Sequence, residues 1–472
     1  MDRSSPRPTA RQATWAIVAT SIAAMLAGFA ALYFVYADRA GETMVAWLSG
    51  RTTWLGVTIE GPWTVLLPAA GVAITMPVIV WMQRRFFPGT EGTGIPQAIA
   101  AIELGDRPER GLMLSFRIAV GKMLLLSLAL ISGITVGREG PSVHVAACCM
   151  HLSARFCRIE RWLIQRGLIL AGSAAGIAAA FNTPVAGVVF CFEEVGRTFD
   201  KKSVPAIIRT VAIACAIGVA VLGDYRFYGS SNSDAALPLA IDTDLHTWLL
   251  EMRQWFAIPV AGVVGGFLGG WFGRGVVAGS RRIAPSLIAR PWRTGIALGL
   301  ALAVIGLLSS GSSYGGGHSQ AERMLETAAE TGVPIAGWSD PIAKAAASFV
   351  SLISAIPGGL FDPSLAVGAG IGQATHGFIE ATIAPGIGLP ELMLIFMAGY
   401  FAGVVQSPIT VFTILFEMTG AYGMLLPLMF AAMIGAIIAG RICEPSIYEA
   451  LAKSFLEAKG IGPSESKPGT AS

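Results

Sequence analysis

The stretch GREGPSVHV at residues 137–145 returns in outline as GLFDPSLAV at residues 359–367. Both begin with glycine and reach Pro-Ser at the same spacing, with an apolar residue after it. A second pair follows each in the same order, PVAGVVFCFE at 184–193 and PITVFTILFE at 408–417. Two motifs in the same order indicate a duplicated half. Interrupted apolar segments at matching positions of two halves mark the binding site in many membrane proteins.

The composition is that of a membrane protein. Of 472 residues, 54% are hydrophobic and 13% are charged, against about 25% charged residues in soluble domains. The net charge of +3 is small and spread along the chain, which does not suggest nucleic-acid binding. Six cysteines without CxxC spacing and five scattered histidines indicate neither a disulfide framework nor a metal centre, so we expect no cofactor.

The charges that flank the first apolar runs predict the orientation. Arginines precede a run at about 14–36 that is long enough to span a bilayer. This basic flank predicts a cytoplasmic N-terminal segment, 1–13. The next run, about 63–82, ends at Arg84-Arg85 and returns these charges to the same side.

Beyond that point, long and short apolar segments alternate. Full-length spans are expected at roughly 112–133, 255–279, 293–309 and 422–440. The pieces between them are cut by Gly and Pro and are shorter than the ~20 residues needed to cross: 94–103, 139–150, 165–181, 184–195, 363–376 and 408–419. Irregular backbone at membrane depth is tolerated only inside protein or along a watery cavity. We therefore expect a thick core with a pathway inside it.

Four of these breaks carry candidate chemistry: Gly92–Pro96, Gly137–Pro141, Gly358–Pro363 and Tyr448, which follows Pro445. A helix start offers free NH groups and the positive end of the helix dipole, which suit an anion. The hydroxyls of Thr93 and Tyr448 would add donors. Each break also has an ordinary alternative, namely a Gly/Pro turn, a surface charge pair, a helix cap at Asp362 or an interfacial tyrosine.

Glu139 stands at one of these helix starts, where a carboxylate is electrostatically favoured. A carboxylate there can occupy the place that a mobile anion would take, and its protonation would free that place. The alternative is a surface pair with Arg138.

Together the four breaks resemble the CLC family of chloride channels and chloride/proton antiporters, over nearly the whole chain from about 14 to 455. GTGIP at 92–96 is similar to the family's GSGIP, GREGP at 137–141 to its G[K/R]EGP and GLFDP at 359–363 to its GxFxP. Tyr448 is similar to its chloride-coordinating tyrosine. The resemblance implies an all-α membrane protein, a CLC-type inverted repeat with many tilted and broken helices.

The repeated motifs and this resemblance give the domain boundaries. We expect one transmembrane domain, 14–455, with two inverted repeats at about 14–225 and 246–440 and a final helix at 443–455. The polar, Gly- and Ser-rich residues 456–472 are expected to form a disordered cytoplasmic tail.

The resemblance also implies roles for single residues. Glu139 is implied as the gating glutamate. Thr93 and Tyr448 are implied as side-chain ligands of a central chloride, which the NH groups of Leu360 and Phe361 complete. The implied backbone donors nearer the outside are Arg138, Glu139, Gly140 and Asp362. Asp362 is unexpected in an anion-binding site, because its carboxylate would repel the anion.

Glu194 falls where the family's antiporters have their internal proton glutamate. Arg197, Lys201 and Lys202 follow it, which places this end in the cytoplasm. The alternative is that Glu193-Glu194 form salt bridges with those basic residues. Glu193 and Glu417 occupy equivalent positions in the repeated motif and are therefore the better candidates for structural roles.

The function implied is exchange of chloride for protons, not enzyme catalysis. Two alternatives share the fold: a proton-gated chloride channel in which Glu194 is idle, and an antiporter that prefers another anion such as nitrate. A transporter of an unrelated substrate, or a membrane enzyme or sensor, would need a site that the sequence does not display. The resemblance further implies a homodimer in a bacterial inner membrane, surrounded by lipid, with both termini cytoplasmic.

Overall fold

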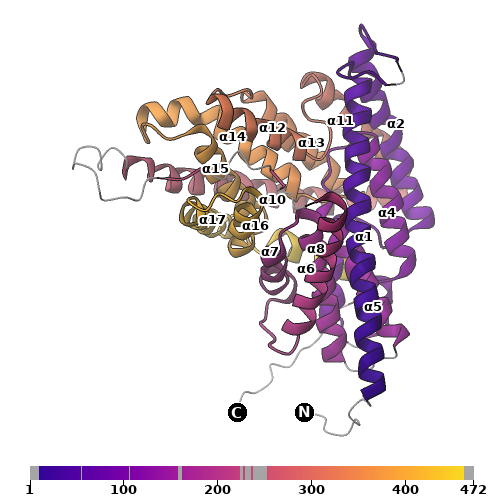
Figure 1. Ribbon diagram of the computed structural model, residues 1–472. Helices are drawn as coiled ribbons and strands as arrows, with labels where there is room; N and C mark the ends of the chain where they lie inside the picture. Colours follow the sequence, from indigo (N-terminus) through magenta and orange to yellow (C-terminus); the bar gives the residue numbers. More distant parts are fainter. Residues whose placement is uncertain are drawn as a thin grey trace.

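The computed structural model describes residues 10–54, 56–105, 107–157, 162–223, 227–228, 235–237 and 252–461. Within these ranges the chain consists of helices and the segments that join them, with three isolated β-bridges and no β-strand. Figure 1 shows long helices standing side by side along one edge, with shorter helices packed behind and beside them.

The first half of the chain contains α1 (Ala10–Leu48), α2 (Trp63–Phe86), α3 (Ile95–Glu103), η1 (Pro108–Leu112), α4 (Phe116–Ile131), α5 (Glu139–Phe156), α6 (Trp162–Phe181), α7 (Pro184–Phe190), η2 (Cys191–Gly196) and α8 (Val204–Leu222). The second half contains α10 (Ala257–Ala289), α11 (Pro291–Leu308), α12 (His318–Thr331), α13 (Ser339–Ile353), α14 (Phe361–Thr382), α15 (Leu389–Val405), α16 (Pro408–Thr419), α17 (Leu425–Gly440) and α18 (Ile447–Ala458).

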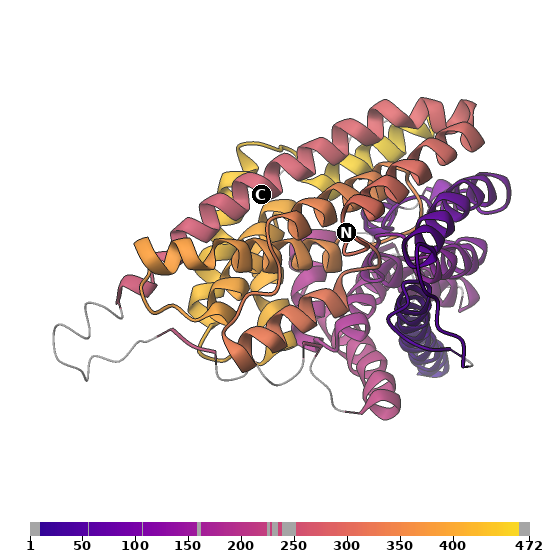
Figure 2. The ribbon, with the colours of Figure 1, turned by 90° about the horizontal axis from the view of Figure 1, so that it is seen from above.

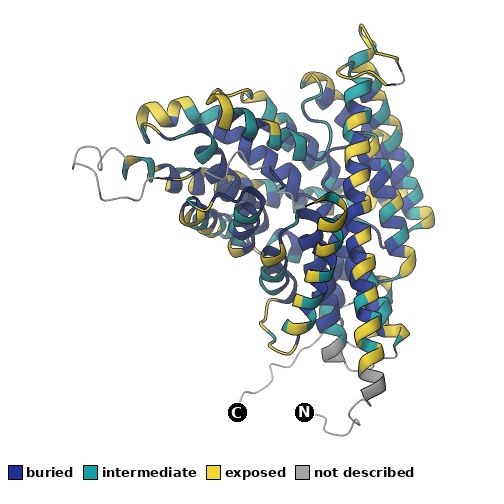
Figure 3. Cartoon of the chain, in the orientation of Figure 1, coloured by how far each residue is buried: buried dark blue, intermediate teal, exposed yellow. Residues whose placement is uncertain are grey.

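The chain is a multi-pass membrane protein. In the described ranges, six helical segments are long and apolar enough to cross a bilayer: Thr14–Leu48, Trp63–Phe86, Pro108–Ile131, Val204–Leu222, Met252–Ala289 and Pro291–Leu308. The span at α8 is not among those expected from the sequence. Figure 3 shows buried residues gathered where the helices meet and exposed residues along outer faces such as that of α1.

Most of the predicted helix starts agree with the structure, whereas several helix lengths do not. α1 has 39 residues and continues past Tyr36, because Asp38 is buried against Arg138 rather than exposed to lipid. α14 has 22 residues instead of a short piece at 363–376. α18 runs from Ile447 to Ala458, so the final helix begins and ends later than expected. The predictions for residues 1–9, for the repeat boundaries at 225 and 246 and for residues 462–472 lie outside the described residues.

The two halves meet at the aligned glycines of the repeated motif. Gly137 and Gly359 form an antiparallel bridge, in which the NH of each donates to the carbonyl of the other at N···O distances of 2.9 and 2.6 Å. Figure 2 shows the two halves of the chain lying side by side. This bridge sets the start of α5 directly against the start of α14.

Two buried lysines repeat the same pattern on either side of this joint. Lys122 on α4 donates to the Gly92 carbonyl at 2.8 Å, and Lys344 on α13 donates to the Gly315 carbonyl at 3.0 Å. Each lysine holds the glycine loop that precedes a helix, α3 in the first case and α12 in the second. Gly94 and Gly317, the residues before those helices, have φ of 97° and 108°, a conformation that favours glycine.

Glu193 and Glu417 cap each other's helices, so the structural role predicted for them is confirmed. The Glu193 carboxylate accepts hydrogen bonds from the NH groups of Ile409 and Thr410 at 3.0 and 2.6 Å, at the start of α16. The Glu417 carboxylate accepts from Val185 and Ala186 at 3.1 and 2.7 Å, at the start of α7. A carboxylate is favoured at a helix start by both hydrogen bonding and the helix dipole.

Glu193→Gln is expected to lower the apparent Tm of the detergent-purified protein. An amide has one acceptor oxygen, so its NH2 group would face one of the two NH donors. Loss of a helix cap costs about 1 kcal/mol. Glu457→Gln, at an exposed position near the end of α18, is the matched control. An apparent Tm equal to that of the control would show that the cap contributes nothing.

Candidate functional site

Helix starts converge on the joint between the halves. The residues that precede α3, α5 and α14 provide no side-chain cap, in contrast to α7 and α16, which glutamates cap. The first NH groups of a helix have no partner within the helix. A buried helix start without a cap therefore offers donors to an anion.

Glu139 closes the space between these starts. Its side chain is fully buried, and neither carboxyl oxygen has a hydrogen-bond partner. Oε2 lies against Gly137, and a Cβ built on Gly359 would stand 2.8 Å from it. A buried carboxylate without hydrogen bonds is costly. The position suits a group that moves or takes up a proton.

Two buried hydroxyls lie on the other side of Glu139, toward the ends of α2 and α18. The hydroxyls of Thr93 and Tyr448 have no hydrogen-bond partner. Thr93 packs on the start of α5, where a Cβ on Gly140 would come within 2.9 Å of its Cβ. The Tyr448 ring stacks on Phe361 with centroids 6.4 Å apart. Buried polar groups are normally satisfied, so both hydroxyls are available as donors to a ligand.

Leu360 and Thr93 line a cavity of about 520 Å³. Arg84 and Lys459, at the ends of α2 and α18, line the same cavity. The predicted central residues Thr93, Leu360, Phe361 and Tyr448 stand at the starts of α3, α14 and α18, and Thr93 and Leu360 are the two that line this cavity. The cavity gives these two residues access to the end of the molecule where α2 finishes.

Arg138 and Asp362 belong to a buried charged cluster on the opposite side of Glu139. Arg138 Nη1 lies 3.4 Å from Asp38 Oδ2 on α1, so Arg138 is not the surface charge considered above. A second cavity, about 530 Å³, reaches Asp38 from the end where α1 finishes. Sequence reasoning missed Asp38 and Lys344, although the matching positions of Lys122 and Lys344 in two apolar runs were a usable signal.

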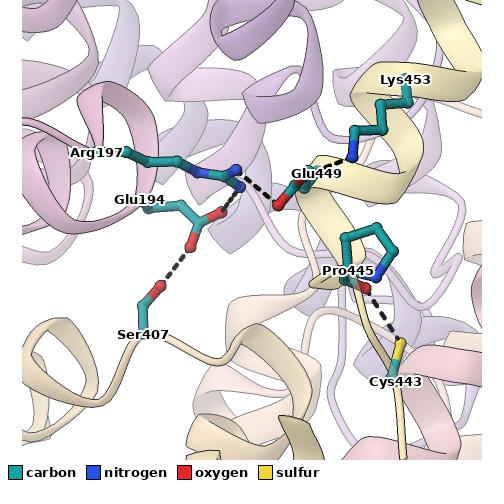
Figure 4. Close-up of polar contacts among 7 residues, drawn as sticks. All are labelled: Glu194, Arg197, Ser407, Cys443, Pro445, Glu449 and Lys453. Carbon is teal, nitrogen blue, oxygen red and sulfur yellow. Dashed lines mark hydrogen bonds and ion pairs between the residues drawn. The ribbon is translucent and has the colours of Figure 1, made fainter. Parts of the chain in front are cut away.

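Glu194 lies in the second half of η2 and lines a third cavity, about 590 Å³. Figure 4 shows its contacts with Ser407 and Arg197. It is buried and accepts a short hydrogen bond from the Ser407 hydroxyl. Arg197 stands 4.0 Å from Glu194 but pairs with Glu449 at 2.6 Å. Lys453 holds Glu449 from the other side at 2.7 Å. Of the salt bridges considered as an alternative, only this long contact with Arg197 is formed among the described residues.

The cavities place Asp38, the partner of Arg138, and Glu194 toward opposite faces. Residues of α18 line both the Thr93 cavity and the Glu194 cavity, whereas the Asp38 cavity opens where α1 ends and before α2 begins. α2 has 24 residues, or about 36 Å at 1.5 Å per residue, so these ends are separated by a membrane thickness. No three His, Cys, Asp or Glu side chains come together as metal ligands within the described ranges.

Comparison with known proteins shows the family of the chain. The voltage gated chloride channel family matches residues 71–440. The H(+)/Cl(-) exchange transporter ClcA of Vibrio cholerae serotype O1 (strain M66-2) is 27% identical over 434 residues, covering 90% of this chain and 86% of the relative. ClcA of Vibrio vulnificus (strain YJ016) is 28% identical over 429 residues, with coverage of 90% and 86%.

Solved structures share the fold. A slow cyanobacterial Cl-/H+ antiporter superposes with a TM-score of 0.75 at 21% identity, covering 97% of this chain and all of the other. A eukaryotic CLC transporter superposes with a TM-score of 0.70 at 20% identity, covering 93% and 74%. Fold and site define an all-α, multi-pass membrane protein with the CLC architecture. The chain belongs to the voltage gated chloride channel family.

Proposed function

We propose that this protein exchanges chloride for protons across a membrane. Glu139 acts as the outer gate and Glu194 as the internal proton glutamate. The observation that supports the proposal is a pair of buried carboxyls: Glu139, which has no hydrogen-bond partner at the joint of uncapped helix starts, and Glu194, which lines a separate cavity. The relatives named H(+)/Cl(-) exchange transporters support the same substrates.

Chloride occupies a central site made by the hydroxyls of Thr93 and Tyr448 and the NH groups of Leu360 and Phe361. These donors carry no full charge, so the anion is held weakly enough to leave again. Nearer the outside, the backbone NH groups of Arg138, Gly140 and Asp362 form a second anion position, which the Glu139 carboxylate fills when it is in place. A proton on Glu139 releases the carboxylate from this position.

Tyr448→Phe is expected to weaken chloride binding about tenfold. A hydrogen bond to a charged group contributes about 1.5 kcal/mol, and about 1.4 kcal/mol corresponds to a factor of ten in Kd. Isothermal titration calorimetry in detergent measures the Kd directly. Tyr422→Phe, at an exposed tyrosine, is the matched control. Equal Kd values for the two variants would remove Tyr448 from the chloride site.

Antiport is favoured over a channel of the same fold by Glu194. Its carboxyl is buried, bonded to Ser407 and served by its own cavity, an arrangement that a pure anion channel does not need. The alternative is an antiporter that prefers nitrate to chloride. Calorimetric titration with nitrate in place of chloride distinguishes the two substrates by their Kd values.

The deciding experiment uses purified protein in liposomes that are loaded with chloride and diluted into a low-chloride medium, with valinomycin and potassium to balance charge. Chloride leaving the liposomes should drive protons inward, so the external pH rises. A protonophore should collapse this change. Chloride efflux without proton movement would identify a channel and contradict the proposal.

We also infer the wider organisation. The two halves form inverted repeats, 14–225 and 246–440, a division supported by the reciprocal bonds of Gly137 with Gly359 and by the mutual capping through Glu193 and Glu417. The protein acts without a cofactor, as a homodimer in lipid of a bacterial inner membrane, with both termini in the cytoplasm.

A further inference from the structure

A second buried carboxyl stands beside the gate. Asp362, in the first turn of α14, is 1% exposed, and neither of its carboxyl oxygens has a hydrogen-bond partner. The Glu139 carboxylate lies against the start of α14 across the joint: a Cβ built on Gly137 would meet Glu139 Oε2 and would stand 3.4 Å from Cδ of Pro363, the neighbour of Asp362. Two carboxylates this close and this deeply buried repel each other and have no water to stabilise them.

The groups that face Asp362 come from several elements around the joint. Arg138 interacts with both Asp362 and Asp38, and Lys344 interacts with Asp362 and Asp38. Tyr228, which lies after α8, has a buried hydroxyl without a hydrogen-bond partner. His318, at the start of α12, lies against the rings of Phe227 and Tyr228.

The charges of this cluster do not balance by themselves. Its buried acids are Asp38, Glu139 and Asp362, and its buried bases are Arg138 and Lys344. With every group ionised, one negative charge is left without a partner. Glu322, 3.9 Å from His318, and Glu42, which faces Lys344 and Asp38, are partly exposed and are not counted among the buried acids. An unpaired charge inside protein is costly. One added proton would make the buried cluster neutral and is therefore favoured.

Arg138 and Lys344 also show which acids take that proton. Asp38 is the acid with a base at ion-pair distance, Arg138 at 3.4 Å, and it lines the outer cavity. Lys344 Nζ is turned to the carbonyls of Tyr314 and Gly315, at 3.1 and 3.0 Å, and is not bonded to a carboxylate. Glu139 and Asp362 are left as the pair without hydrogen bonds.

We propose that Asp362 is a second proton-binding carboxyl of this protein and shares one proton with Glu139 across the joint between the halves. The inference rests on the proposed exchange of chloride for protons. Because Asp362 is fixed in the first turn of α14, it holds a proton beside the gate and does not carry one across the membrane.

The consequence concerns the outer anion position. When Glu139 leaves that position with the shared proton, Asp362 remains as a carboxylate beside the NH groups that should bind chloride. It repels the anion until it takes a further proton from the outer cavity. Chloride binding there is therefore linked to uptake of one proton at Asp362, and chloride affinity falls as pH rises.

The test isolates Asp362 by removing the gate's own titration. In Glu139→Gln, the chloride Kd should still rise with pH, by about tenfold per pH unit once Asp362 ionises, as linkage to one proton requires. In the double variant Glu139→Gln/Asp362→Asn, the Kd should be independent of pH. Asp340→Asn, an aspartate in the first turn of α13 that is not fully buried, is the matched control in the same background and should keep the slope.

A second measurement needs no variant of Asp362. Infrared difference spectra of Glu139→Gln, with and without chloride, should contain the carbonyl stretch of a newly protonated carboxylic acid. A chloride Kd of Glu139→Gln that does not change with pH, or a spectrum without that band, would overturn the proposal. If liposomes carrying the native chain fail to exchange protons while the pH-dependent Kd and the band are present, the antiport proposal fails and the Asp362 assignment stands.

Discussion

Glu139→Gln should reduce proton flux in liposomes to background while chloride still crosses the membrane. The glutamine side chain has the size of a protonated glutamic acid but cannot give up or accept the proton. It therefore resembles the state in which the outer anion position is free. The native carboxylate fits between Gly137 and Gly359 without a hydrogen bond, so no structural contact is lost with the charge.

The measurement is the ratio of proton to chloride flux, recorded with a pH electrode and a chloride electrode on the same liposomes. Glu330→Gln, an exposed substitution of the same chemistry on α12, controls for reconstitution and should keep the ratio of the native chain. Proton uptake driven by chloride in Glu139→Gln would assign the gate to another residue.

The sequence predicts helix starts well where Gly and Pro mark them. Ile95, Glu139, Pro184 and Pro408 begin helices at or within a residue of the expected positions, because these residue types restrict the backbone locally. Helix ends are less predictable. α1 continues past Tyr36, where Asp38 forms an ion pair with Arg138, a residue distant in the sequence.

The residues of the candidate site also fall into those that local sequence predicts and those that depend on packing between distant segments. The helix starts and Glu139 follow from local motifs, whereas a role for Tyr448 needs the family resemblance, since one buried tyrosine is otherwise unremarkable. Asp38 escaped prediction because its relevance depends on packing between α1 and α5. The charge imbalance around Asp362 required the burial and placement of Lys344, which is set by contacts of α13 with the loop before α12.

The second large effect is expected at the inner face. Glu194→Gln should leave chloride flux running but uncouple it from protons, because the group that relays protons between the cytoplasm and Glu139 is gone. Ser407 donates to the Glu194 carboxylate, and a glutamine oxygen can accept the same bond. The substitution therefore removes the proton site and spares the local packing.

The residue next to Glu194 provides a closely matched control. Glu193 is its neighbour in sequence, yet its carboxylate caps α16, so Glu193→Gln should lower stability while keeping the flux ratio. Uncoupling by Glu194→Gln but not by Glu193→Gln would separate proton relay from helix capping on adjacent residues. Chloride that still drives protons uphill in Glu194→Gln would exclude Glu194 as the relay. Protons would then have to pass from the cavity lined by Arg197 and Glu449 to Glu139 by a route without that carboxyl.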